Sequence, residues 1–245
     1  RVGQFKYPFT LENPYSPTTL ETIENSTVIS KLSGYSDESK IGANGREIGL
    51  ALFGGFVKKS GYNLIDYYVG VVNGNGINNK DINTHKDITG ILTFNPIKPL
   101  AIAISHYNGK YGEAIKVDDK EIANGLTRVR TGFGAKYDDK KLLVRGEYLF
   151  GSTGIEFDEN DKEVTKDGNG YYLTAAYYVA PKWQPVVKYD YYQSDDKKDS
   201  SKQTNYIAGL NYYPIKNVRL QLNYTHRSQK DANRDLLATQ LLISF

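Results

Sequence analysis

The chain has 245 residues and a formal net charge of +3, with 39% hydrophobic and 13% aromatic residues and no Cys or Met. This length suits one large domain or two small ones, and the aromatic content excludes a disordered chain. Without Cys there is no disulfide framework, thiolate metal site or cysteine nucleophile. No apolar run approaches the roughly 18 residues of a membrane-spanning helix, and the 31 basic and 28 acidic residues do not cluster as in nucleic-acid-binding proteins.

The first residue is Arg1, and no charged stretch followed by an apolar one marks a signal peptide. We therefore expect a processed or partial product.

Apolar and polar residues alternate with a period of two along most of the chain, which is typical of β-strands, while a helical apolar stripe is nearly absent. In the stretch from Val218 to Thr225, the even positions are apolar and the odd positions polar. This pattern predicts twelve strands. They are expected at Arg1–Tyr7, Gly45–Val57, Tyr62–Asn73, Lys86–Asn95, Leu100–Asn108, Gly125–Tyr137, Lys141–Gly151, Gly170–Ala180, Trp183–Gln193, Gln203–Tyr213, Asn217–Arg227 and Leu236–Phe245.

The connections between these strands alternate between long and short. The long connection Pro8–Asn44 is followed by the short Lys58–Gly61, and the later connections repeat this alternation as far as Ser228–Asp235. One end of the structure should therefore carry tight turns and the other end loops. This arrangement, with strands of about ten residues, is typical of an outer-membrane β-barrel. A large soluble β-sandwich or a lipocalin-like barrel is the alternative fold class.

The last predicted strand carries Leu237, Leu241, Ile243 and Phe245 on one face. An apolar alternating strand that ends in Phe resembles the assembly signal of bacterial outer-membrane barrels. Tyr and Phe also gather near strand ends, where an aromatic girdle would meet the lipid headgroups, although Tyr is a common strand residue in any sheet.

Several sequence pieces resemble the phosphate-selective porin O and P family, in the form found in Bacteroidetes-type bacteria. The resemblance extends over nearly the whole chain and is most specific in its first half. It is carried by RVGQFKYPF at 1–9, ETIEN at 21–25, GREIGL at 45–50, GVVNGNG at 70–76 with Asp81, Lys86 and Asp87 following, and SHYNG at 105–109.

The resemblance implies an integral outer-membrane porin of a Gram-negative bacterium, without a cofactor, surrounded by lipid and lipopolysaccharide. It would allow passive diffusion of small, preferentially anionic solutes, among them phosphate or polyphosphate. Members are implied to have about sixteen strands and to form homotrimers, so residues 1–245 would be one β-barrel domain that lacks about four N-terminal strands. A closed twelve-stranded barrel is the alternative, because the strand number is even.

Counting back from the last strand places residues 8–44 between the fifth and sixth strands of such a barrel. Porins of this architecture fold that loop into the lumen as the constriction. Ser16 followed by Pro17 predicts a helix start here. The loop carries more acidic residues than basic ones, which departs from what a strict phosphate filter requires. The acidic residues are Glu12, Glu21, Glu24, Asp37 and Glu38, against Lys31 and Lys40.

Lumen charges follow from strand parity, because the polar positions of each strand should face inward. The basic inward positions are Lys6, Arg128, Arg130, Lys136, Lys141, Arg145, Lys188 and Arg219, and the acidic ones are Glu47, Asp66, Glu147 and Asp190. This basic excess predicts a pore that favours anions, since Arg binds phosphate or carboxylate oxygens in a bidentate manner.

We predict six of the basic residues as pore-lining, anion-binding positions: Lys6, Arg128, Arg130, Arg145, Lys188 and Arg219. Of these, Arg130, Arg145 and Lys188 should lie near mid-membrane. Lys6 also belongs to the Gly-Gln-Phe-Lys motif of the family that the chain resembles. The alternative is that these cations pair with Glu147 and Asp190 and only brace the wall.

Catalysis is not expected. His106 and His226 follow the lipid-facing parity of their strands, and His85 lies in a loop, so none faces the lumen beside a Ser or Asp partner. The acidic stretch Glu156–Glu163 lacks the ordered spacing of a calcium loop, so we interpret it as a solvated loop and expect no metal site. The remaining alternatives are a plugged barrel with a structural or partner-docking role and a soluble β-rich binding protein.

Overall fold

The computed structural model describes residues 1–16, 18–33, 36–37, 39, 45–117, 120–230 and 232–244, with the side chains of 116–117 and 120–122 left out. Parts of the predictions rest on residues outside this description, namely Pro17, Glu38, Lys40, Asn44 and Phe245.

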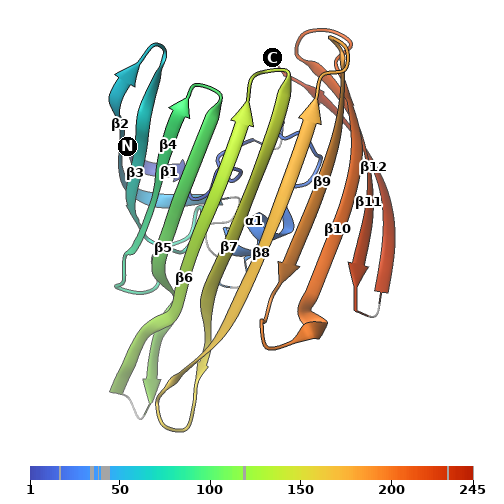
Figure 1. Cartoon of the computed structure of the whole chain (residues 1–245). Helices are drawn as coiled ribbons and strands as arrows, with labels where there is room; N and C mark the ends of the chain where they lie inside the picture. Colours follow the sequence, from blue (N-terminus) through green and yellow to red (C-terminus); the bar gives the residue numbers. More distant parts are fainter. Residues whose placement is uncertain are drawn as a thin grey trace.

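Twelve strands form one antiparallel sheet in which each strand pairs with its neighbours in the chain (Figure 1). They are β1 Val2–Lys6, β2 Arg46–Lys59, β3 Tyr62–Val72, β4 Asp87–Ile97, β5 Leu100–Val117, β6 Lys120–Asp138, β7 Leu142–Phe157, β8 Glu163–Tyr177, β9 Trp183–Gln193, β10 Lys202–Tyr212, β11 Val218–Gln229 and β12 Ala232–Ile243. The predicted all-β class and the twelve strands are confirmed.

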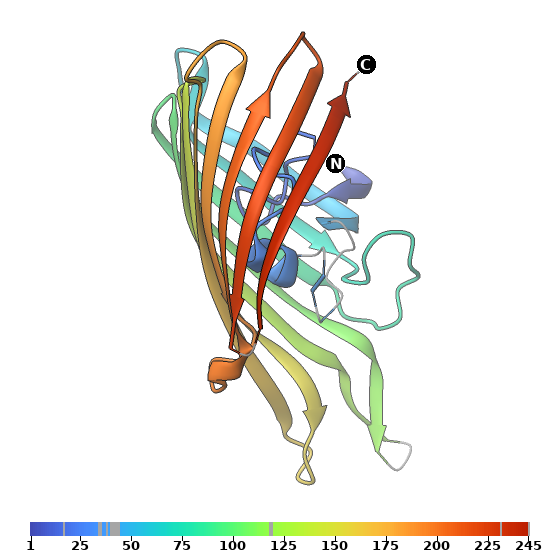
Figure 2. The same ribbon diagram turned by 90° about the vertical axis from the view of Figure 1, so that its right-hand side faces the viewer.

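The sheet is strongly curved and open, with β1 and β12 as its two edges (Figure 2). A closed twelve-stranded barrel, the alternative considered from the sequence, is therefore not what the described residues form. The described residues between β1 and β2 lie in the concavity of the sheet. We call the concave side of the sheet its inner face and the convex side its outer face.

Polar side chains occupy the inner face and apolar ones the outer face. On β11, Gln221 and Asn223 are buried toward the inner face, whereas Leu220 and Leu222 on the outer face are each 43% exposed. On β12, Leu237 is 68% exposed on the outer face. In a soluble protein, apolar side chains are mostly buried and the exposed apolar area is limited. Apolar side chains on the outer face and polar ones on the inner face are the pattern of a barrel whose outer face meets lipid.

Three of the connections predicted to be long are shorter in the structure, because the strands beside them are longer. Strands β5 and β6 extend to Val117 and Lys120, and β7 and β8 extend to Phe157 and Glu163. Strand β12 begins at Ala232, so only residues 230–231 separate it from β11. Polar and Gly-rich sequence still forms ladder hydrogen bonds in an antiparallel hairpin, so polarity alone did not mark the strand ends.

The helix lies later in the segment than predicted. Thr19 bonds back to the carbonyl of Ser16, but that turn does not continue into a helix. The α-helix α1 instead covers Thr27–Leu32, and it buries Val28, Ile29 and Leu32. These three apolar residues lie one and four positions apart, so they share one face of α1, and this face packs against the sheet, which we also call the wall. This spacing, rather than the Ser-Pro start signal, explains where the helix lies. A 3₁₀ turn, η2, covers Asp199–Ser201.

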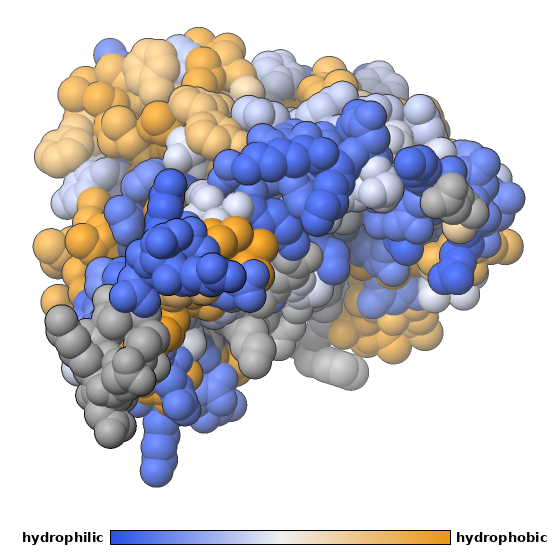
Figure 3. Space-filling view, turned by 90° about the horizontal axis from the view of Figure 1, so that it is seen from below, coloured by the Kyte–Doolittle hydropathy of each residue, from blue (hydrophilic) through white to orange (hydrophobic). Residues whose placement is uncertain are grey.

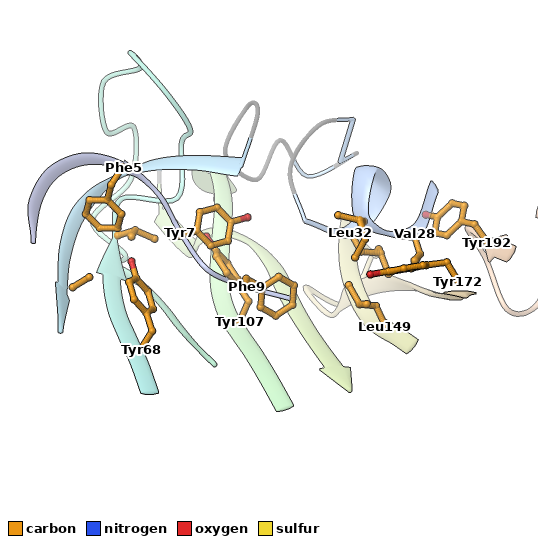
Figure 4. Close-up of a cluster of buried hydrophobic side chains, with 13 residues drawn as sticks. Phe5, Tyr7, Phe9, Val28, Leu32, Tyr68, Tyr107, Leu149, Tyr172 and Tyr192 are labelled. Atoms are coloured by element: carbon orange, nitrogen blue, oxygen red, sulfur yellow. The ribbon is translucent and has the colours of Figure 1, made fainter. Parts of the chain in front are cut away.

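The apolar core lies between the inner face and the chain that covers it (Figure 4). Tyr7 and Phe9, which follow β1, pack against Tyr107 of β5 with ring centroids 5.9 and 6.1 Å apart. Val28 and Leu32 of α1 lie beside Leu149, Tyr172 and Tyr192 of the wall. This core holds the covering chain against β5 to β9.

Candidate functional site

The candidate site is the inner face together with residues 8–44, which we call the inserted segment. Its described part lies against the wall over β5 to β11, with α1 in the concavity (Figure 2). Side chains of the distant strands bind its backbone: Asn211 donates to the carbonyl of Glu21 (2.9 Å), and Asn223 accepts from the N–H of Ile23 (2.7 Å). Such contacts join residues about 200 positions apart, so sequence spacing alone did not reveal them.

Glu147 and Asp190 of the wall bind the inserted segment rather than neighbouring cations. Glu147 accepts the backbone N–H groups of Leu11 (2.6 Å) and Glu12 (2.9 Å). Asp190 accepts the N–H and the hydroxyl of Thr27 at 2.8 and 2.6 Å. Both carboxylates thus fix the backbone of the segment at two points, one of them the first turn of α1.

Arg145 and Lys188 are brought together by carboxylates of the inserted segment. Arg145 lies 2.8 Å from Glu21 and 3.3 Å from Glu12, and the Lys188 ammonium lies 3.9 Å from the same Glu12. Burial alone would raise the pKa of Glu12, but Lys188, Arg145 and hydrogen bonds from Ser26 hold that pKa below its usual value. Glu12 is therefore a buried anion between two wall cations.

Arg128 and Arg130 of β6 are also nearly fully buried. Arg128 forms an ion pair with Asp87 and donates to the carbonyl of Ser39 at 2.8 Å. Arg130 lies 3.5 Å from Asp37 of the inserted segment and donates to the hydroxyl of Ser39 at 3.2 Å. These two guanidinium groups hold the later part of the segment against β6.

Lys6 and Arg219 contact the inserted segment at its backbone. Lys6 donates to the carbonyl of Tyr15, and Arg219 donates to the carbonyl of Thr18 at 2.6 Å. All six basic residues predicted as pore-lining positions thus lie on the inner side and touch the segment. Arg145 and Lys188 share the carboxylate of Glu12. The other four residues contact the inserted segment at other positions along the chain. The binding of anions by the six residues stays a prediction.

Sequence reasoning did not identify the carboxylates that pair with these cations. Asp87 shares the inner-face parity of Thr89, two positions along β4, so strand parity could have placed it on the inner face. Glu12 and Asp37 gave no such signal, because the segment that carries them has no strand parity. Lys136, one of the inward basic positions, donates to the hydroxyl of Tyr15 at 3.0 Å.

The histidines and the acidic loop lie away from the inner face. His106 contacts Thr131 at 3.0 Å on the outer face, and His226 contacts Asp235 at 2.8 Å there. In the loop after β7, Asp158 accepts the backbone N–H groups of Lys162 and Asn160, which lower its pKa. Among the described residues no group of three or more His, Asp or Glu side chains is arranged to hold a metal.

No helix in the described part of the chain is long and apolar enough to cross a membrane. The end of the molecule that carries the long connections presents mostly hydrophilic residues, with hydrophobic ones gathered toward the margins (Figure 3).

The fold is that of outer-membrane porins. The outer membrane channel DcaP of Acinetobacter baumannii has a TM-score of 0.68 and 13% identity, over 100% of this chain and 71% of that one. OmpF of Salmonella typhi, solved with daunomycin, has a TM-score of 0.63 and 15% identity, over 90% of this chain and 72% of that one.

Residues 159–242 match the family model of phosphate-selective porin O and P. The predicted family resemblance is confirmed there, in the last third of the chain rather than in the first half, where the quoted motifs lie. The comparison with curated proteins found no match. Together, the family match and the porin fold support an outer-membrane channel and an integral outer-membrane location.

Proposed function

We propose that the protein is an outer-membrane porin that lets small solutes diffuse passively and prefers anions, phosphate among them. The observation that carries the channel proposal is the inserted segment, which is fixed along the polar inner face of a porin-like sheet by side chains of β6, β7, β9 and β11. A segment held in this way narrows a water-filled lumen without crossing the lipid.

The anion preference rests on the cations of the inner face. Arg128, Arg130, Arg145 and Lys188 each have a carboxylate within 4 Å, so much of their charge is compensated. Within the described residues, Arg219 and Lys136 of this face form no ion pair: Arg219 donates to the carbonyl of Thr18 and Lys136 to the hydroxyl of Tyr15. In a narrow, low-dielectric tube, such cations raise the local concentration of anions.

A plugged barrel with a structural or partner-docking role is the second candidate. It is favoured by the same segment, because α1 adds an apolar core to its polar contacts with the wall. Insertion of the purified protein into a planar bilayer separates the two. We expect stepwise single-channel currents, and a protein that inserts but conducts no ions would favour the plugged barrel.

We also propose that the protein forms homotrimers among lipid and lipopolysaccharide. Support comes from the continuous apolar outer face, on which side chains such as Leu52, Val187 and Leu237 are more than half exposed. The molar mass of the protein in detergent, measured by light scattering, should be three times that of one chain. A mass of one chain would contradict this assembly.

A further inference from the structure

Two tyrosines lie next to each other on the inner face, at the end of the sheet with the tight turns. Tyr178 follows β8 and has the parity of Ala176, and Tyr213 follows β10 and has the parity of Asn211. Ala176 and Asn211 are buried toward the inner face, so both tyrosines point inward. Their ring centroids are 5.7 Å apart, with the planes tilted by 40°. Both side chains are only partly buried, so aromatic surface remains open on an otherwise polar face.

The two tyrosines line an open recess of about 300 Å³. The buried side chains of Leu143 and Gln184 also line it. Thr19 and Glu21 belong to its lining as well, so the recess lies between the inserted segment and the wall. None of the lining residues belongs to the edge strands β1 and β12. The volume is at the lower end of the range for small-molecule sites, which suits a single ring-sized solute.

Hydrogen-bonding groups surround the two rings. The Oε1 of Gln184 accepts from the amide of Asn211 at 3.1 Å and from the hydroxyl of Tyr213 at 3.2 Å, which fixes the orientation of this side chain. Its Nε2 donates to no group among the described residues and is free to donate to a solute. Arg219 uses one terminal nitrogen for the carbonyl of Thr18 and has further N–H donors.

The charges around the recess are largely compensated. The carboxylate of Glu21 is held in its ion pair with a wall arginine, at 2.8 Å. The ammonium group of Lys141 lies 5.2 Å from the ring centre of Tyr177, a side chain of the outer face. Asp138 and Lys140, which also line the recess, carry opposite charges. An aromatic surface with polar groups and little net charge suits a neutral solute that has both an apolar face and hydroxyl groups.

We propose that Tyr178, Tyr213 and Gln184 form a binding site for one pyranose ring of a neutral sugar. The inference rests on the proposed channel function and gives the channel a solute class besides anions. The C–H groups on one face of a pyranose ring are apolar and pack against aromatic rings, while its hydroxyl groups accept from Gln184 and Arg219. An inorganic anion has no apolar face and gains nothing from the two aromatic rings.

The test is the binding of glucose to the purified protein, measured by saturation-transfer NMR in a detergent without a sugar headgroup. We expect saturable binding, with saturation transferred to the C–H protons of the sugar ring. Sorbitol, an open-chain polyol without a rigid ring face, should bind much more weakly, and inorganic phosphate should not displace glucose. Absence of glucose binding, equal binding of sorbitol, or displacement by phosphate overturns the site.

Variants of the two tyrosines test which group binds the sugar. Tyr178→Leu and Tyr213→Leu should each weaken the affinity for glucose about tenfold, because the aromatic face is lost while an apolar side chain remains. Tyr213→Phe should weaken it much less, because the ring remains.

Tyr212→Leu is the matched control, because Tyr212 is the neighbouring residue on the outer face, where its ring stacks on Trp183 with centroids 4.2 Å apart. Its affinity for glucose should equal that of the unchanged protein. Heat-dependent migration on gels checks that each variant is folded. Equal affinity in all folded variants, or a loss in Tyr212→Leu as large as in Tyr213→Leu, overturns the site.

Failure of the channel function would look different, because the binding measurement needs no ion flow. A protein that binds glucose but conducts no ions in planar bilayers would overturn the proposed function and leave the site supported. A protein that conducts ions but binds no glucose would overturn the site alone. In the conducting protein, glucose should also reduce the single-channel current, and Tyr213→Leu should weaken this reduction.

Discussion

At the scale of single residues, Glu147 is an acceptor for three donors. The N–H groups of Leu11 and Glu12 and the hydroxyl of Tyr172 all donate to its carboxylate. A buried donor that loses its acceptor costs about 1 to 3 kcal/mol. The role of this residue is therefore to position the inserted segment.

We predict that Glu147→Ala releases the start of the inserted segment, with a loss of about 2 kcal/mol in docking free energy from the unpaired donors. The amides of Leu11 and Glu12 should exchange with deuterium much faster, as measured by mass spectrometry. Asp66→Asn is the control, since within the described residues Asp66 accepts only from Asn63 and Asn95 of the sheet. Equal exchange in both variants would contradict the positioning role.

The ion pairs of Glu12 predict a dependence of docking on pH. Its pKa is lower in the folded protein than the usual 4.5, despite burial, because Lys188 and Arg145 favour the charged form. A lowered pKa adds stability that is present above pH 4.5 and is lost as the pH falls through the folded value. The contribution of Glu12 to docking should thus weaken as the pH falls below about 4.5.

Limited proteolysis of residues 8–33 at a series of pH values, with an acid-tolerant protease, measures this loss. Glu12→Gln should remove that part of the pH dependence, because the amide does not titrate in this range. A transition between pH 5 and 7 that persists in Glu12→Gln would show that another group controls docking.

Strand parity could predict which way the charged residues face, but not what they bind. It placed Arg145 and Lys188 on the inner side, next to Glu147 and Asp190 in sequence. The structure pairs them with Glu12 and Glu21 instead, because the inserted segment brings carboxylates from more than 100 residues away. Partners supplied by a loop without strand periodicity give no signal in a single sequence.

At the scale of elements, α1 depends on the wall for its N-terminus. Ser26 at the N-cap makes no side-chain cap bond, and the first turn has no acidic residue. Asp190 of β9 supplies the missing acceptor to Thr27 at 2.8 Å. A helix of six residues is too short to be stable alone. The contact with Asp190 and the packing of the apolar face of α1 together stabilise it.

We predict that Asp190→Ala destabilises α1 by about 1 to 2 kcal/mol, the usual cost of losing an N-cap acceptor. Faster amide exchange over residues 27–33, with unchanged exchange in β9, would confirm it. Asp190→Asn should have a smaller effect, because the amide oxygen still accepts a hydrogen bond. No change in either variant would show that packing alone holds the helix.

The inserted segment as a whole should narrow the pore. Lys6 and Arg46 are directly opposite in the register of β1 and β2, so a short turn can replace residues 8–44. We predict that this replacement increases single-channel conductance several-fold, since cross-sectional area sets the current. Unchanged conductance would show that the segment does not lie in the conducting path.

The strands themselves could largely be predicted from the sequence, because the period of two is strong where one face meets lipid. The bounds of β9 were predicted at Trp183–Gln193, as the structure has them. The hairpins of β5–β6 and β7–β8 extend further than predicted, since outside the lipid band no apolar alternation marks the strands, yet their backbones still pair.

At the scale of the whole molecule, the sheet has a polar inner face, an apolar outer face, and tight turns at one end. These features follow from a barrel wall between water and lipid. The structure shows twelve strands of such a wall with open edges at β1 and β12. The expected sixteen-stranded trimer remains a prediction from the family resemblance.

The most direct test of the account is the reversal potential of the channel in a KCl gradient. We predict anion preference, because Arg219 and Lys136 of the inner face bind uncharged groups, whereas carboxylates of the inserted segment compensate Arg145 and Lys188. The preference should weaken at high salt, where a shorter Debye length screens these charges. A pore that prefers potassium would contradict the account.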